Sequence, residues 1–199
     1  MQVDDATGIC IQIGLLTNAE MFYLTQNDWQ KQILQQPDIN KVPDFNYDKW
    51  VLYGIDSNPA SIAIMLDKYG GSNVSWICAY VSHNSNTIVP VRDQTSEDIH
   101  SNLFSPTITL SSLINGLALD RIDVLKIDIE GSELQVISNY QFEIKPRYIS
   151  IECHEMYNEG CTDRIQRILE MQGYDISNIQ YTNIGRTIEL QAILPYSRR

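Results

Sequence analysis

The segment 126–133 combines charged and apolar residues in a pattern suited to chemistry. Lys126, Asp128 and Glu130 alternate with isoleucines, and alternate residues of a β-strand share one face. Three charges on one face of a buried strand cost free energy unless they are paired or serve a site. A solvated edge strand is the alternative, which the flanking apolar residues disfavour. Gly131 permits a tight turn directly after these charges.

A second polar pair lies further along the chain, in another apolar run. Glu152 and His154 are two residues apart, so they face the same way on a strand. Beside Asp128 they would form either a general-base relay or a site for a hard metal ion. A single histidine is more often a packed or surface residue, so this prediction depends on the two segments converging.

Asp56 ends an earlier apolar run and is a candidate for ribose binding. A carboxylate at the end of such a strand can accept hydrogen bonds from both hydroxyls of an adenosine ribose. The alternative is a helix cap. Because Asn58 is better placed for capping, with Pro59 at the first helical position, we favour ribose binding.

These residues follow short apolar runs that predict the strands of a sheet. The predicted strands cover residues 9–14, 50–55, 75–81, 122–129, 148–153, 176–181 and 187–194. Near-continuous apolar runs are typical of parallel strands covered on both faces. The last two runs, joined at 183–186, predict an antiparallel hairpin at one edge.

Helical periodicity falls between several of these runs, at residues 58–70, 132–140 and 162–171. Alternating strands and helices predict an α/β fold, a Rossmann-like, doubly wound and mostly parallel sheet. Two polar stretches fit less well. We expect part helix and part loop at 26–48, and loop at 84–106 with one short strand possible at 87–91.

Composition limits the class of protein. The 199 residues carry a formal charge of −11, which opposes a nucleic acid or an anionic membrane surface as a partner. No apolar run approaches the roughly 20 residues of a bilayer span, and we expect a single cytoplasmic domain over residues 1–199. The four cysteines lack disulfide or zinc spacing, so we expect reduced side chains.

Taken in order, these segments resemble the FkbM-type methyltransferases, within the class I S-adenosylmethionine-dependent enzymes. The resemblance rests on residues 123–133, which look like the hallmark segment of that family. Support comes from four further segments, at 54–59, 79–82, 150–154 and 169–174.

The resemblance implies a seven-stranded sheet, S-adenosylmethionine as methyl donor, and transfer to a hydroxyl oxygen. The donor would contact six positions: Gly14, Asn18, Asp56, Ser57, Ala79 and Tyr80. Asp128, Glu152 and His154 would be catalytic, with Asp128 or His154 as the base. A divalent cation held by these three residues is a further possibility.

Our leading hypothesis is therefore O-methylation of a sugar, glycan or natural-product small molecule. A nicotinamide-dependent oxidoreductase needs a Gly-x-Gly-x-x-Gly turn after the first strand, which the sequence lacks. The alternative is a catalytically silent module that binds a partner protein. It is motivated by the turn at 12–18, which has one glycine and no carboxylate. The oligomeric state is not predicted.

Overall fold

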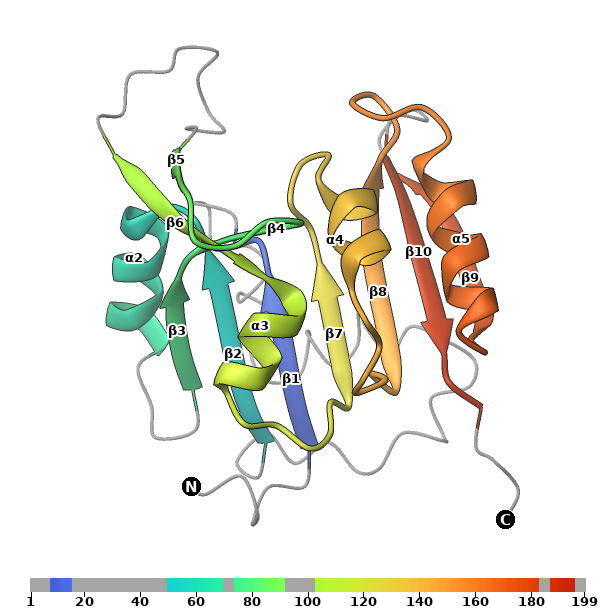
Figure 1. The fold of residues 1–199 in the computed structure, drawn as a ribbon, viewed down its shortest axis with the longest axis horizontal. Helices are drawn as coiled ribbons and strands as arrows, with labels where there is room; N and C mark the ends of the chain where they lie inside the picture. The colour runs from blue at the N-terminus through green and yellow to red at the C-terminus, as the bar shows by residue number, and fades with distance from the viewer. Residues whose placement is uncertain (1–7, 16–49, 70–73, 92–102, 183–186, 196–199) are drawn as a thin grey trace.

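The computed structural model describes residues 8–15, 50–69, 74–91, 103–182 and 187–195. Seven strands form one sheet (Figure 1) in the order β3-β2-β1-β7-β8-β10-β9. Their bounds are β1 Gly8–Ile13, β2 Trp50–Asp56, β3 Val74–Cys78, β7 Val124–Ile127, β8 Tyr148–His154, β9 Asp175–Thr182 and β10 Thr187–Ile193. β10 pairs antiparallel with β8 and β9, and the other pairs are parallel. The predicted fold class is confirmed, including the C-terminal hairpin.

The order of the strands reverses next to β1. The chain proceeds from β1 to β2 and β3 on one side, and β7 and β8 lie on the other. Ligands of open parallel sheets bind at the carboxyl ends of the strands, where the order reverses. The carboxyl ends of β1 and β7 are therefore the place to look for a site.

Helices cover both faces of this sheet. Ile9, Ile11 and Ile13 of β1 belong to the main apolar core together with residues of α3 (Leu110–Gly116), α4 (Glu133–Asn139) and α5 (Cys161–Met171). Met65 of α2 (Pro59–Tyr69) instead packs with Leu15 in a separate cluster. Within the described ranges, no helix combines the length and the apolar character needed to cross a membrane.

A small second sheet corrects two predictions. The run 75–81, predicted as one strand, divides at Ala79 into β3 and β4 (Tyr80–Ser82), and β4 pairs with β6 (Phe104–Thr109). β5 (Ile88–Pro90) pairs with the other edge of β6, at the strand predicted for 87–91. β6 and α3 were not predicted. β6 buries Ser105 and Thr107 rather than a run of large apolar residues, so it lacks the usual signal.

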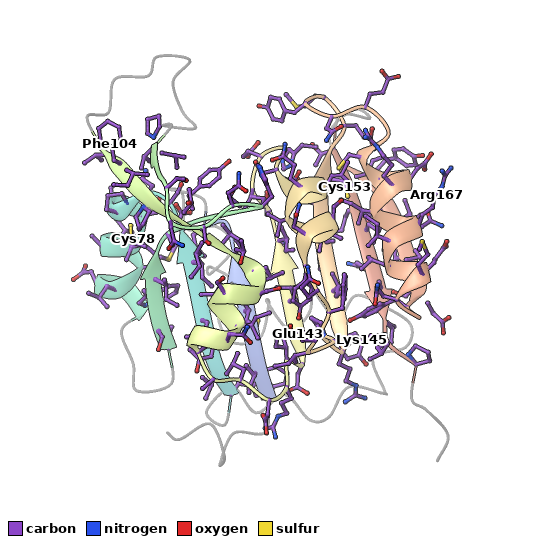
Figure 2. The ribbon with its side chains drawn as sticks, in the orientation of Figure 1. Cys78, Phe104, Glu143, Lys145, Cys153 and Arg167 are labelled. Atoms are coloured by element: carbon purple, nitrogen blue, oxygen red, sulfur yellow. The ribbon has the colours of Figure 1, made fainter. Side chains whose placement is uncertain are left out.

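The four cysteines are free, as the sequence predicts. Cys10, Cys153 and Cys161 are buried and Cys78 is partly buried. Figure 2 shows Cys153 at the opposite end of the sheet from Glu143 and Lys145.

Gly14 joins the carboxyl ends of β1 and β7. Its φ is +88°, and a Cβ atom built on it would lie 1.6 Å from the backbone oxygen of Asp128. The Gly14 amide donates to the Ile55 carbonyl at 2.9 Å, and the Asp128 amide donates to the Ile13 carbonyl at 2.9 Å. Only glycine meets both the conformation and the contact.

We expect Gly14→Ala to destabilise the protein far more than Gly173→Ala. Gly173 has a φ of +89° but nothing within 4 Å of its Cβ position, so alanine there costs only about 1–2 kcal/mol of backbone strain. At Gly14 the backbone of Asp128 must also move, which raises the cost to about 3 kcal/mol or more. Urea unfolding followed by circular dichroism measures both. Equal losses of unfolding free energy in the two variants would mean that the contact with Asp128 does not contribute to stability.

Candidate functional site

Asp56 is held rigidly at the end of β2. Its side chain accepts hydrogen bonds from the Leu15 amide and from the Asn58 amide, each at 2.7 Å, and the residue is buried. Burial raises the pKa of Asp56, although the bonded amides act in the opposite direction. Asn58 itself caps α2, because its Oδ1 accepts from the Ala60 amide at 2.9 Å. Asp56 is thus not the side chain that caps α2, and ribose binding stays a prediction.

The next strand end is tied to Asp56 and to the turn after β7. The Ala79 amide donates to the Asp56 carbonyl at 2.9 Å. The Tyr80 hydroxyl lies 2.9 Å from Ser132 Oγ. The Ser57 carbonyl accepts a long contact from Cys78 Sγ, at 3.8 Å. Ser57, Ala79 and Tyr80 therefore lie with Asp56 at this edge, whereas Asn18 lies outside the described residues.

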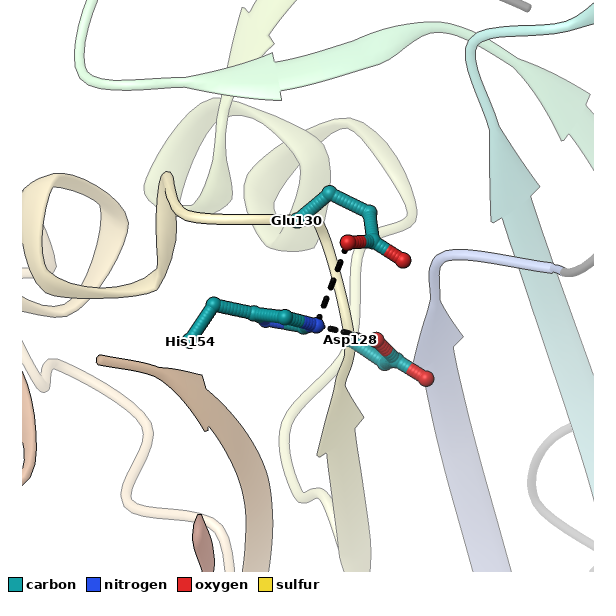
Figure 3. A group of neighbouring side chains, drawn as sticks. All are labelled: Asp128, Glu130 and His154. Atoms are coloured by element: carbon teal, nitrogen blue, oxygen red, sulfur yellow. Dashed lines mark ion pairs between the residues drawn. The ribbon is translucent and has the colours of Figure 1, made fainter. Parts of the chain in front are cut away.

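Beyond β7 the chain turns sharply, which corrects the predicted strand 122–129. β7 ends at Ile127, and Glu130 has a φ of +52°. Asp128 and Glu130 are therefore turn residues, not members of one strand face with Lys126. The turn brings Glu130 back towards His154 at the end of β8 (Figure 3).

His154 lies at the centre of a group of carboxyl side chains. Its Nε2 is 3.2 Å from Glu130 Oε2 and 3.9 Å from Asp128 Oδ1, and its Nδ1 is 2.8 Å from Glu133 Oε1. The predicted convergence of Asp128 and His154 on one edge is confirmed. We call Asp128, Glu130 and His154 the carboxylate–histidine cluster (Figure 3).

Glu133 fixes the orientation of the histidine. Its Oε1 also accepts from the amides of Ile129 at 3.2 Å and Gly131 at 2.9 Å. Because this oxygen accepts, the Nδ1 atom of His154 carries the proton, and Nε2 faces Asp128 and Glu130. Glu133 is fully buried. Its position just after the turn could be read from the sequence, but not its contact with His154.

Glu152 contacts Asp128 rather than the histidine ring. The two carboxyl groups are hydrogen-bonded to each other. Burial, the charge of Asp128 and this hydrogen bond raise the pKa of Glu152 to about 7. Burial also raises the pKa of Asp128, against the opposing effects of Lys126 and His154. This contact therefore favours a proton on Glu152 near neutral pH.

The charge around His154 shifts its own titration. Burial lowers the pKa of His154, but the hydrogen bond to Glu133 and the charges of Glu133, Glu130 and Asp128 together raise it to about 9. In the absence of another cation the ring is therefore an imidazolium at neutral pH.

The cluster has the spacing of a metal site. One ligand atom from each of Asp128, Glu130 and His154 lies within 4.8 Å of the others. This set differs from the one expected from the sequence, because Glu130 takes the place of Glu152.

Comparison with known proteins identifies the family. Residues 16–176 match the model of the methyltransferase FkbM domain. The chain belongs to this family. The predicted family is thereby confirmed. No curated protein sequence matches the chain.

Solved structures share the fold of this FkbM domain at low sequence identity. TrmK of M. capricolum, in complex with S-adenosylhomocysteine, is 12% identical with a TM-score of 0.51, covering 94% of this chain and 62% of its own. Fibrillarin of Aeropyrum pernix, with bound S-adenosylmethionine, is 12% identical with a TM-score of 0.52 and coverages of 95% and 67%. A Streptococcus agalactiae protein of the NADB-Rossmann superfamily is 9% identical with a TM-score of 0.54 and coverages of 98% and 65%. The FkbM chain thus spans less than two thirds of the length of TrmK.

Leu15 lies in the turn at 12–18, just after β1. Its side chain is buried against Met65, with Ile62 and Trp76 beside them. Leu15 therefore contributes to the packing of α2 against the sheet.

The raised pKa of His154 predicts a pH-dependent stability. In chelator-treated protein, this group stabilises the fold fully below its unfolded pKa near 6.5, and the contribution is lost as the pH rises through about 9. We expect Glu133→Gln to lower the pKa of His154 and to flatten this loss. NMR titration of the ring and urea unfolding at several pH values measure the two effects.

Glu143→Gln is the matched control, because Glu143 is exposed and lies at the far end of the sheet (Figure 2). An unchanged pKa of His154 in Glu133→Gln would contradict the role assigned to Glu133.

Proposed function

We propose that this FkbM-domain protein transfers a methyl group from S-adenosylmethionine to a hydroxyl oxygen of a sugar, glycan or natural-product small molecule. One observation carries the proposal. Asp56 and Asp128 both bond to the turn around Gly14, where the strand order reverses. This is the position at which open α/β sheets bind nucleotides. The family assignment supports methyl transfer.

The residues at this edge suit the adenosine part of the donor. The Asp56 carboxylate accepts from the Leu15 and Asn58 amides and from the Ser57 amide, which leaves it acceptor capacity for a ribose hydroxyl. Ser57 lies beside it, and we assign Ala79 and Tyr80 to the adenine and Gly14 to the methionine part. Asn18, assigned to the methionine part from the sequence, lies outside the described residues. Two proteins of similar fold support this donor: TrmK was solved with S-adenosylhomocysteine, and fibrillarin was solved with S-adenosylmethionine.

The charge of the site also suits the donor. When bound, S-adenosylmethionine supplies an electrophilic methyl group on a positively charged sulfonium. Asp128, Glu130 and Glu152 gather beside the turn that holds Gly14. Asp128 is buried, and a carboxylate fixed in a buried site stabilises a nearby positive charge more than it would in water.

The chain has two remaining tasks in this reaction. It must align the acceptor oxygen with the methyl carbon and the sulfur, and it must receive the hydroxyl proton. We assign the catalytic roles to Asp128, Glu152 and His154. The bonded carboxyl pair of Asp128 and Glu152 receives the proton, and His154 positions the acceptor.

A small acceptor fits the charge of the protein better than a nucleic acid does. The formal charge of −11 opposes binding of a polyanion. The silent binding module remains the competing proposal. Its motive is the turn at 12–18, where leucines stand in place of small residues and would crowd the donor. Because Leu15 packs against Met65 instead, this motive is weaker.

We expect the protein to bind S-adenosylhomocysteine and S-adenosylmethionine in calorimetry, and Asp56→Asn to weaken both by about tenfold or more. A hydrogen bond to a charged group contributes about 1.5–3 kcal/mol, and asparagine replaces one acceptor oxygen by an NH2 donor and removes the charge. Asp67→Asn is the matched control, since Asp67 is exposed on α2. Thermal melts confirm that both variants fold. No binding of either compound at millimolar concentration would defeat the proposal.

We expect labelled methyl transfer to hydroxylated acceptors and not to their deoxy analogues. The product should resist alkaline hydrolysis, because a methyl ether resists it whereas a methyl ester does not. Asp128→Asn should lower the rate by about 100-fold or more and leave the affinity for S-adenosylhomocysteine nearly unchanged, since this product has no sulfonium. Label on nitrogen or carbon would contradict O-methylation.

A further inference from the structure

The carboxylate–histidine cluster offers three ligands from two neighbouring segments. Asp128 and Glu130 come from the turn after β7, and His154 ends β8. The three ligand atoms lie within 4.8 Å of one another. One cation placed between them would reach all three with small side-chain movements, because ligand distances to divalent metals are about 2.0–2.2 Å.

The histidine is oriented as a metal ligand would be. Glu133 accepts the Nδ1 proton at 2.8 Å from a fully buried position. Metal-bound histidines usually donate their second ring nitrogen to a carboxylate or carbonyl in this way. The Nε2 lone pair of a neutral ring would then point at Asp128 and Glu130 (Figure 3).

The charge around His154 points to a cation at the same place. Carboxyl oxygens of Asp128, Glu130 and Glu133 lie within 3.9 Å of the ring nitrogens of His154, and Asp128 and Glu133 are buried. Glu152, which contacts Asp128, lies outside the three-ligand set. Lys126 is also buried, and its positive charge stabilises the ionised carboxylate of Asp128. Even with Lys126, the carboxylates around His154 outnumber the cations.

We propose that Asp128, Glu130 and His154 bind one divalent transition-metal ion, with Mn²⁺ as the best match, and that this ion holds the acceptor hydroxyl. The second part rests on the proposed function. Two carboxylate oxygens suit Mg²⁺, Ca²⁺ and Mn²⁺, whereas an imidazole favours transition metals, so the mixed set selects Mn²⁺. Glu130 is 37% exposed, which leaves one side of the ion open to an acceptor.

The ion would lower the pKa of the bound hydroxyl, as metal ions do for bound water. The hydroxyl proton passes to the carboxylate of Glu152. The oxygen–carbon bond forms as the carbon–sulfur bond of the donor breaks, and the donor leaves as uncharged S-adenosylhomocysteine. Asp128 remains a ligand, and Glu133 acts on the reaction only by positioning His154.

Titration of the chelator-treated protein with Mn²⁺, followed by electron paramagnetic resonance, tests the site. We expect one Mn²⁺ per chain, with a nitrogen coupling in electron spin echo modulation that disappears in His154→Gln. Glu130→Gln should weaken binding at least tenfold. Glu143→Gln, which removes the same charge far from the cluster, should leave the affinity unchanged.

Glu130→Gln is informative because Glu130 is partly exposed, so the substitution removes a ligand charge without disturbing the core. Glu152→Gln should weaken binding less than Glu130→Gln, because Glu152 balances Asp128 but is not a ligand. Equal weakening in Glu130→Gln and Glu143→Gln, or binding without nitrogen coupling, would overturn the metal site.

Binding of S-adenosylhomocysteine, measured separately with chelator present, tests the donor site without the ion. Donor binding without Mn²⁺ binding would therefore reject the metal site alone. Mn²⁺ binding without donor binding would reject the proposed function and leave the ion site in place.

Discussion

The contact between Gly14 and the backbone of Asp128 is the constraint on which the site depends. The carboxyl ends of β1 and β7 approach so closely there that any side chain at position 14 would overlap a carbonyl oxygen. Asp56 holds the next residue, Leu15, through its carboxylate. The same few atoms therefore fix the candidate ribose ligand on one side and the start of the carboxylate-rich turn on the other. A doubly wound sheet brings these segments together only where its strand order reverses.

Negative charge is the second organising feature. Within the part of the chain that the structure describes, carboxyl groups of Asp128, Glu130, Glu133 and Glu152 surround or adjoin His154. Asp128 and Glu133 are buried, and burying carboxylates without balancing cations is costly. One oxygen of Glu133, Oε1, is satisfied by two amides and the histidine. The remaining groups retain excess charge, which a cationic donor and a bound metal ion would both relieve.

Much of this arrangement could be predicted from the sequence, because apolar runs mark buried parallel strands. The seven strands, the hairpin and the approach of Asp128 to His154 follow from such runs. The turn at Glu130 could not be predicted, since a positive φ at glutamate is set by the tertiary contacts that hold it. Without that turn, the sequence predicts Glu152, and not Glu130, as the third residue beside Asp128 and His154. β6 was missed because its buried residues are serine and threonine.

The adjacent residues Ala79 and Tyr80 link the two sides of the candidate site. The amide of Ala79 is anchored to Asp56, and the hydroxyl of Tyr80 reaches Ser132. These bonds form a short strap from the end of β2 to the turn that carries Glu130. A dipeptide thus sets the spacing between the two sides of the candidate site.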